Sequence, residues 1–467
     1  MTDITIIDAP CGAGKTSFAI QHINENPNES FVFCTPYLTE IQRIIGSCKN
    51  PNGTNRFYEP KQYETGRKID GFNTLLDEGA DIAVTHSTFL NATPDTLDFI
   101  RRGNYTLFVD EVLDTIIEFN DAQSVEESGG RQMIQKGDLD FLFQNNLIEV
   151  GHDYKVTWTG KDTEAGEHKF SKVRQYADLG RLYCVRNKLM MLVFPPEIFS
   201  CFKKVYLMTY LHDGTMFPSY LEYFRLPYGL ATIQRDAENH YRLAEYSPTS
   251  DYEFRRRCCE LIHICDNERL NGGYEKTSLS MSWFERQSKD KAVQNPQNKT
   301  LAQLKTDLAH FLTKCVPDAK ASNGDIMWTA PKEYVGNLKG KGYTSIRALT
   351  REERTLPPER LNKLEMSLSC FVVQNARATN DYGKRWVLAY CVNKYYNRLT
   401  KGFFEDRNAE RIDNGYLPLH LDEDKYALAS LIQWVFRSRI RNGQPIWVYV
   451  PSSRMRELLK AWLVCKI

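Results

Sequence analysis

Short apolar runs alternate with amphipathic stretches along the first half of the chain. Such runs begin near Asp3, Phe31, Asp81, Leu107 and Lys203, and each is bounded by turn residues or by a cluster of polar residues. Runs of this length that are rich in β-branched and aromatic residues predict strands, and the stretches between them have the length of helices. This alternation predicts an α/β fold with a mostly parallel sheet.

The second half of the chain repeats the pattern. Strands are predicted at Ser278–Phe284, Asp325–Ala330, Ser369–Gln374 and Pro445–Val450, and helices at about 300–315, 425–442 and 452–464. We therefore expect two domains, residues 1–225 and 226–467. Residues 120–190, which include a polar stretch and an alternating segment, exceed what the first domain needs, and we expect them to form a subdomain inserted into it.

Composition changes this picture only slightly. The 467 residues carry 60 Lys and Arg against 59 Asp and Glu, so net charge neither favours nor excludes nucleic acid as a partner. Apolar runs stay shorter than the roughly 18 residues that predict a membrane span. A strand-like run follows Met1 directly and leaves no room for a signal peptide, so we expect a cytoplasmic protein with no membrane partner.

The 12 cysteines are scattered along the chain. The densest group, Cys258, Cys259, His263 and Cys265, lacks the second ligand pair that a structural zinc site usually has. We interpret these thiols as small buried side chains in a reducing compartment.

The loop after the first strand has the composition of a phosphate-binding loop. The residues that follow Asp8 read Ala-Pro-Cys-Gly-Ala-Gly-Lys-Thr, which is P-loop spacing with Ala9 in place of the first glycine. Glycines let the backbone turn its N–H groups toward phosphate oxygens, and the helix that begins near Lys15 adds its positive end. The predicted nucleotide-binding residues are Pro10, Cys11, Gly12, Ala13, Gly14, Lys15, Thr16 and Ser17. The alternative is a glycine-rich turn that carries Lys-Thr without a ligand.

An acidic pair follows the strand that begins at Leu107. Asp110 and Glu111 would lie at the carboxyl end of that strand, where ligands bind in open α/β sheets. In P-loop ATPases an acid at this place holds Mg²⁺ together with the hydroxyl of the P-loop, here Thr16, and a following Glu orients the attacking water. The two motifs together predict a site for ATP and Mg²⁺, with Glu111 as a catalytic residue.

The P-loop followed by this acidic pair resembles the superfamily 2 (DEAD/DEAH-like) helicases and related DNA or RNA translocases. Thr35-Pro36 is similar to the family's turn that holds the nucleic-acid backbone. Thr85, His86 and Thr88 are similar to its strand-end motif that touches phosphates. Thr209 occupies the place of the motif that couples hydrolysis to strand movement. The resemblance implies two tandem RecA-like P-loop domains, with nucleic-acid contacts through these residues.

A segment near the end of the chain resembles the family's last motif. There a Gln is followed by arginines that reach the γ-phosphate from the second domain, and Gln433, Arg437 and Arg441 would share one face of a helix here. The sequence departs from the family at two points: Phe436 replaces a glycine, and the last arginine comes one residue late. The resemblance implies catalytic roles for these three polar residues.

Arg377, Thr379 and Asn380 lie where the family's motif V contacts nucleotide and nucleic acid. Together with the last motif, they are similar to helicase-like ATPases encoded by bacteriophages and related mobile elements. A basic segment with Lys339, Lys341, Tyr343 and Arg347 offers further candidate contacts to backbone phosphates and bases.

The resemblance implies an ATP-dependent helicase or translocase that acts on nucleic acid in phage or mobile-element replication or recombination. Single-stranded DNA is the favoured substrate, RNA is not excluded, and replication proteins are possible partners. A phage-encoded chain would act in the host cytoplasm. Two alternatives stay open: a P-loop ATPase that binds nucleic acid and remodels complexes without unwinding, and a small-molecule P-loop kinase.

Overall fold

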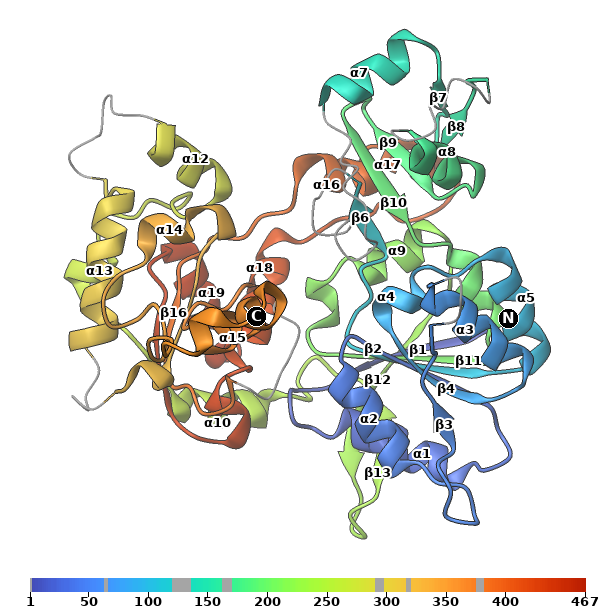
Figure 1. Ribbon diagram of the computed structural model, residues 1–467, viewed down its shortest axis with the longest axis horizontal. Coiled ribbons are helices and arrows are strands. Elements are labelled where there is room, and N and C mark those ends of the chain that lie inside the picture. Colours follow the sequence, from blue (N-terminus) through green and yellow to red (C-terminus); the bar gives the residue numbers. More distant parts are fainter. Residues whose placement is uncertain are drawn as a thin grey trace. The chain divides into compact units, whose positions relative to one another are not determined.

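The computed structural model describes residues 2–62, 66–119, 136–161, 170–289, 298–315, 321–374 and 382–467. Contacts divide the chain into two compact units (Figure 1). The first comprises residues 1–9, 14–246 and 396–421, and the second comprises residues 10–13, 247–395 and 422–467. Both units have the α/β architecture that the sequence predicts.

An eight-stranded sheet in the order β13-β12-β1-β11-β5-β2-β4-β3 forms the centre of the first unit. Its strands are β1 Asp3–Asp8, β2 Phe31–Thr35, β3 Phe57–Tyr58, β4 Asp81–Thr85, β5 Thr106–Asp110, β11 Lys204–Thr209, β12 Gly229–Arg235 and β13 Tyr241–Glu245. Neighbouring strands pair in parallel, except that β12 and β13 are antiparallel. The prediction of a mostly parallel sheet is confirmed.

Helices connect the parallel strands of this sheet. They include α1 Lys15–Glu25, α2 Leu38–Ser47, α3 Lys68–Asp77, α4 His86–Phe89, α5 Pro94–Gly103 and α9 Phe217–Tyr223. The strands β2 and β5 are buried along their whole length, as expected for strands covered on both faces. Phe108 of β5 stacks on Tyr206 of β11, with 4.9 Å between the ring centroids.

The described residues between 116 and 193 form two small antiparallel sheets outside this sheet. Their elements are β6 Ile116–Glu118, α7 Lys136–Gln144, β7 Ile148–Val150, β8 Val156–Trp158, α8 Ser171–Asp178, β9 Leu182–Val185 and β10 Leu189–Val193. One sheet has the order β6-β10-β9 and the other pairs β7 with β8. Leu142, Val173, Leu182 and Met190 belong to a hydrophobic core that these elements share.

Residues 396–421 also belong to the first unit, although the chain on either side of them belongs to the second. They contain α16 Arg398–Glu405 and α17 Asn408–Asp413. Phe403 stacks on Tyr223, with 4.7 Å between ring centroids. Asp406 forms an ion pair with Arg186 and accepts a hydrogen bond from the Tyr154 hydroxyl at 3.0 Å. These contacts fasten the segment beside the small sheets.

A four-stranded parallel sheet in the order β14-β17-β16-β15 forms the centre of the second unit. Its strands are β14 Ile262–Ile264, β15 Ile326–Thr329, β16 Val387–Tyr390 and β17 Ile446–Tyr449. The longer helices are α10 Tyr252–Leu261, α12 Met281–Lys289, α13 Leu301–Lys314, α15 Pro358–Leu368, α18 Glu423–Val435 and α19 Ser453–Leu463. The indole rings of Trp328, Trp434 and Trp462 are fully buried in this unit.

Two strand predictions in the second half are wrong. Ser278–Phe284 alternates as a strand would, but helix α12 begins within it at Met281. Trp283 and Phe284 are both buried on that helix, whereas adjacent residues of a strand would point to opposite faces. Ser369–Gln374 forms only isolated bridges, including one between Phe371 and Trp328. The strands β14 and β16 were not predicted, and each is only three or four residues long.

The structure also differs from the expected helix at 425–442 and from the boundary near residue 225. Helix α18 ends at Val435, and a short 3-10 helix, Arg439–Asn442, follows after a turn. The first unit continues to Tyr246, because β12 pairs in parallel with β1 and β13 pairs with β12.

Candidate functional site

The carboxyl ends of five neighbouring strands meet at one edge of the first unit's sheet. The parallel register places Asp8 beside Thr209, Met208 beside Asp110, Cys34 beside Val109, and Thr35 beside Thr85. The P-loop, which follows Asp8, therefore begins in the same row as Thr35, Thr85, Asp110 and Thr209. This edge is the place where open α/β sheets bind ligands.

The P-loop joins β1 to α1 and contains two glycines in the left-handed region. Gly12 has a φ of 83° and Gly14 a φ of 96°, a conformation that strains any residue with a Cβ atom. A Cβ on Gly14 would also lie 2.1 Å from a ring carbon of Tyr241 on β13. Helix α1 begins directly after this glycine, at Lys15, so the N–H groups of its first turn lie beside the loop. Lys15 Nζ donates a hydrogen bond to the Ala9 carbonyl at 2.5 Å.

The remaining predicted nucleotide-binding residues are partly exposed. They are Pro10, Cys11, Ala13, Thr16 and Ser17. The Ala13 N–H donates to the Pro10 carbonyl at 3.1 Å, which closes a turn inside the loop. Arg43 of α2 lies next to the loop, with Nη2 at 3.5 Å from the Ser17 hydroxyl.

Asp110 ends β5 and is buried. Burial, together with the neighbouring charges of Glu111 and Glu40, raises its pKa to about 7, whereas Lys15 and Arg43 act in the opposite direction. A buried carboxyl group with two acidic neighbours fits a divalent cation, whose charge would favour the ionised form. Asp110 and the Thr16 hydroxyl supply oxygen ligands of the kind that Mg²⁺ prefers.

Glu111 is exposed and is held in place by its backbone and by one side chain. Its φ is 63°, and its N–H donates to the Met208 carbonyl at 3.0 Å. The hydroxyl of Tyr37 donates to Glu111 Oε2 at 2.7 Å. Sequence reasoning missed Tyr37; its signal is an aromatic residue directly after Thr35-Pro36. The bond fixes one of the two carboxylate oxygens.

Asp8 is a second residue that the sequence did not reveal as part of the site. Its buried carboxylate accepts hydrogen bonds from the N–H groups of Leu211 at 2.9 Å and His212 at 3.2 Å. The imidazole Nδ1 of His212 lies 2.5 Å from Asp8 Oδ2. The Ala9 N–H also donates to the Thr209 carbonyl at 3.1 Å. The start of the P-loop and the turn after β11 are therefore joined at several points.

The side chains of Thr35, His86 and Thr88 are buried, which differs from their expected contact with nucleic acid. The Thr35 hydroxyl accepts a hydrogen bond from the Tyr37 N–H at 3.4 Å. The Thr88 hydroxyl lies 3.0 Å from that of Thr85, and His86 Nε2 lies 3.0 Å from the Asp110 carbonyl oxygen. These buried side chains form hydrogen-bond contacts that hold the strand ends and the turns after them. Pro36 and Thr85 are the partly exposed members of the predicted set.

The prediction that Gln433, Arg437 and Arg441 share a helical face is wrong. Gln433 lies in the last turn of α18, which ends at Val435, and Arg441 lies in the following 3-10 helix. Gln433 and Arg441 are exposed, and Arg437 is partly exposed. Arg437 Nη1 donates to the Gln374 carbonyl at 2.9 Å. Their catalytic role no longer follows from a shared face.

Arg377, Thr379 and Asn380 lie outside the described residues. Of the basic segment, Lys339, Lys341 and Arg347 are exposed. Tyr343 is fully buried, and its hydroxyl donates to the Leu338 carbonyl at 2.7 Å. The prediction that Tyr343 stacks on a base is therefore wrong in this structure, because its ring is packed in the core of the second unit.

Two parts of the chain match models of one protein family. The YonV C-terminal Rossmann-like domain matches residues 256–463, and the YonV middle domain matches residues 131–192. The SPbeta prophage-derived protein YonV of Bacillus subtilis (strain 168) is 31% identical over 472 residues, which cover 99% of each chain.

Among solved structures, one titled XPD helicase has a TM-score of 0.51 at 13% identity and covers 99% of this chain and 95% of its own. The likeness concerns the fold. The structure of S. tokodaii Xpd4 gives a TM-score of 0.44 at 11% identity, with 98% and 93% covered. Among the helices that the structure describes, none has the length and apolar character needed to cross a membrane.

Proposed function

The chain belongs to the YonV family, and we propose that it is an ATP-driven helicase or translocase that acts on nucleic acid. The observation that supports this most is the common edge of the first unit's sheet. There the P-loop, the Asp110-Glu111 pair and Thr209 follow three strands paired in one parallel register. The helicase-like fold is consistent with the proposal.

Each residue at this edge has a proposed role in ATP hydrolysis. Lys15 and the N–H groups at the start of α1 bind the phosphates of ATP. Asp110 and Thr16 hold Mg²⁺, which supplies positive charge next to the phosphates. Glu111, fixed by the Tyr37 hydroxyl, orients the water whose oxygen attacks the γ-phosphorus while the bond to the leaving ADP oxygen breaks. The proton of that water passes to the carboxylate or to solvent.

Gln433, Arg437 and Arg441 are proposed to stabilise charge on the transferring phosphoryl group. In other P-loop enzymes, an arginine in this role increases kcat by a factor of about 10³–10⁵. In this proposal the two units act as tandem RecA-like domains, with residues near 120–190 inserted in the first. Thr209 is proposed to transmit the state of the nucleotide, because its carbonyl accepts a hydrogen bond from the N–H group of Ala9 at the start of the P-loop.

The proposed nucleic-acid contacts are Pro36, Thr85, Arg377, Thr379 and Asn380, with single-stranded DNA favoured over RNA. Contacts of this kind go mainly to the backbone, so binding would tolerate many sequences and weaken with salt. The prophage origin of the relative supports a role in replication or recombination of mobile DNA. Replication proteins are proposed partners.

A second candidate is an ATPase that binds nucleic acid and remodels complexes without unwinding. The described residues between 116 and 193 have a hydrophobic core of their own and contact residues 396–421 through the Arg186–Asp406 ion pair. This remodelling function is favoured if their surface binds a protein partner. Strand displacement distinguishes the two. A helicase releases a fluorescent strand from a tailed duplex when ATP is present, and Lys15→Ala abolishes release. Stimulated ATP hydrolysis without release would favour remodelling.

A further inference from the structure

Three aromatic side chains and one arginine, all at least partly exposed, lie side by side on the second unit's sheet. His263 on β14 pairs in register with Trp447 on β17, and their ring centroids are 4.6 Å apart. The ring centroids of Trp447 and Trp386 are 5.4 Å apart, and Trp386 directly precedes β16. The guanidinium carbon of Arg439 lies 4.8 Å from the centre of the Trp386 ring. We call these four residues the aromatic row; His263 is exposed and the other three are partly exposed. Such rings can accept a further flat ring by stacking.

The His263 end of the aromatic row opens into a cavity of about 420 Å³. Its walls include His263 and Trp447 on the strands, Asp266 and Asn267 in the loop after β14, and Phe311 and Cys315 at the end of α13. β14 is an edge strand of the described sheet, so the cavity lies at the border of the unit. The volume is within the range of about 300–1,000 Å³ that is typical of small-ligand sites.

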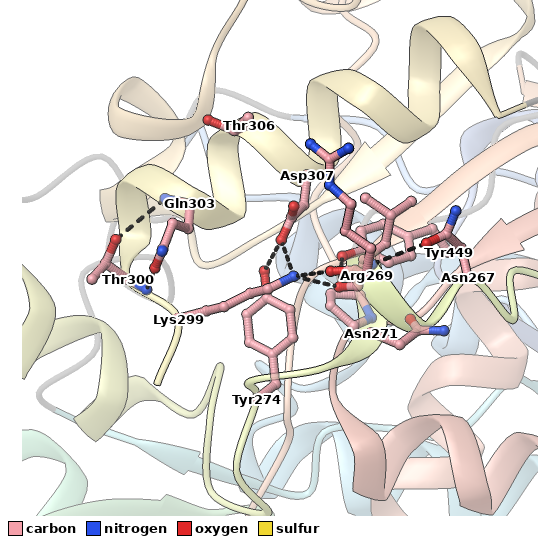
Figure 2. Close-up of polar contacts among 12 residues, drawn as sticks. Asn267, Arg269, Asn271, Tyr274, Lys299, Thr300, Gln303, Thr306, Asp307 and Tyr449 are labelled. Carbon is pink, nitrogen blue, oxygen red and sulfur yellow. Dashed lines mark hydrogen bonds and ion pairs between the residues drawn. The ribbon is translucent and has the colours of Figure 1, made fainter. Parts of the chain in front are cut away.

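The short helix Glu268–Asn271, which follows the loop that lines this cavity, is held by a partly buried ion pair (Figure 2). Lys299 Nζ donates to Asp307 Oδ2 at 2.6 Å. It also donates to the carbonyls of Arg269 at 2.6 Å and Leu270 at 3.0 Å. An ammonium group has three N–H bonds, and these contacts use all of them. Lys299 therefore holds the helix that ends the loop, and it is not a group that would react with a ligand.

One hydrogen bond from the sheet and two within residues 265–271 also hold this segment. The Tyr449 hydroxyl donates to the Leu270 carbonyl at 2.9 Å, and Asn271 Nδ2 donates to the Cys265 carbonyl at 2.7 Å. Asn267 Oδ1 accepts from the Leu270 N–H at 3.2 Å. A loop fixed in this way loses little conformational freedom when a ligand binds, which favours affinity.

One ion pair lies at the wall of the cavity. Lys460 Nζ is 3.1 Å from Asp266 Oδ1, which offsets the charge of that carboxylate. A phosphate attached to a ligand in the cavity would compete with Asp266 for the ammonium group of Lys460.

We propose that the cavity and the aromatic row bind an unstacked base of single-stranded nucleic acid, with Trp447 and His263 stacking on its ring. This inference rests on the proposed function, because it assigns a second contact to the same partner. Aromatic rings next to a basic side chain, here Lys460, are groups that single-strand binding sites combine. A peptide strand added to the edge of β14 would use the backbone of that strand and would not need the rings.

The test measures binding of a fluorescein-labelled oligo(dT) to the full-length protein by fluorescence anisotropy. The variants are His263→Ala and Trp447→Leu, the second of which keeps an apolar side chain against the core. His263→Tyr restores a ring, and His152→Ala, at a side chain that is 86% exposed in the first unit, is the matched control. An oligonucleotide with abasic sites keeps the phosphates and removes the bases.

We expect each ring-removing variant to bind oligo(dT) about 5- to 150-fold more weakly than the wild type. His263→Tyr and His152→Ala should bind as the wild type does, and ATP hydrolysis without DNA should be unchanged in all of them. The abasic oligonucleotide should weaken the wild type by a similar factor and the variants by less, because both changes remove the same contact.

Unchanged oligo(dT) affinity in both ring-removing variants, with a wild type that binds DNA and is stimulated by it, would overturn this inference alone and favour a peptide at the β14 edge. A wild type that neither binds nucleic acid nor is stimulated by it would contradict the proposed function itself.

Discussion

The carboxylate of Asp8 lies 2.5 Å from Nδ1 of His212, and both side chains are buried. Asp8 is the last residue before the P-loop, and His212 lies in the turn that follows Thr209. The same carboxylate accepts two backbone N–H groups from that turn. Because the contact joins the loop expected to bind phosphate to the residue expected to couple hydrolysis to movement, a shift of one should displace the other.

Asp8→Asn should destabilise the protein by about 1–3 kcal/mol, because both carboxylate oxygens accept hydrogen bonds and the amide has only one accepting oxygen and no charge. Urea unfolding of the full chain measures the change. Asp98→Asn, at an exposed carboxylate of α5, is the matched control and should change stability by at most about 0.5 kcal/mol. Equal effects of the two substitutions would show that the buried contact contributes nothing.

Asp110→Asn should stabilise the protein at pH 8 while it abolishes ATP hydrolysis. The folded pKa of Asp110 is raised to about 7 from a usual value near 3.8, so the folded state binds this proton more tightly than the unfolded state does. Wild-type stability should therefore fall as pH rises from about 4 to 7, and the variant should be more stable at pH 8 by on the order of 1–4 kcal/mol.

Thermal unfolding between pH 4 and 8, with and without Mg²⁺, checks this prediction. Mg²⁺ should reduce the difference between wild type and Asp110→Asn at pH 8, because it stabilises the carboxylate. If the stability of the wild type changed between pH 4 and 8 to the same extent as the stability of Asp110→Asn, the account of Asp110 would be refuted.

Tyr37→Phe should lower kcat for ATP hydrolysis about 3- to 30-fold and leave KM nearly unchanged. The hydroxyl fixes Glu111 without touching the phosphates, so its loss affects the orientation of water rather than the binding of ATP. Tyr58→Phe, at an exposed residue of β3, is the control and should hydrolyse ATP normally. A rise in KM with kcat unchanged would instead place Tyr37 in ATP binding.

Gly14→Ala should abolish ATP binding, whereas Gly79→Ala should not. Both glycines have positive φ, so each substitution strains the backbone by about 1 kcal/mol or more. Only at Gly14 would the new Cβ meet a neighbour, the Tyr241 ring. Binding of a fluorescent ATP analogue measures the difference, and circular dichroism confirms that both variants fold. Normal binding by Gly14→Ala would contradict the described loop.

The sequence was sufficient for the parts of the site that follow single strands. The strand runs ending at Asp8, Thr35, Thr85, Asp110 and Thr209 were visible, and a parallel sheet aligns their ends. Contacts across long separations were not predictable. Tyr37 meets Glu111 74 positions away and Asp8 meets His212 204 positions away, and neither pair leaves a local pattern.

Short elements of the second unit were harder to predict because tertiary packing decides them. Ser278–Phe284 alternates in a way that suits a strand, yet the core buries it as the start of a helix. Helix α18 ends at Val435 although the helical pattern of the sequence continues. The Ser438 hydroxyl donates a hydrogen bond to the Val435 carbonyl and closes a turn directly after the helix. The return of residues 396–421 to the first unit depends on Phe403 and Asp406, whose partners lie far away in the sequence.

The rate of ATP hydrolysis by the full-length protein, with and without single-stranded DNA, tests the motor proposal most directly. Duplex DNA and RNA serve as comparison substrates, and Lys15→Ala is the control for the site. The account predicts slow hydrolysis alone, strong stimulation by single-stranded DNA, and loss of both rates in Lys15→Ala. Hydrolysis that no nucleic acid stimulates, or that survives in Lys15→Ala, would contradict it.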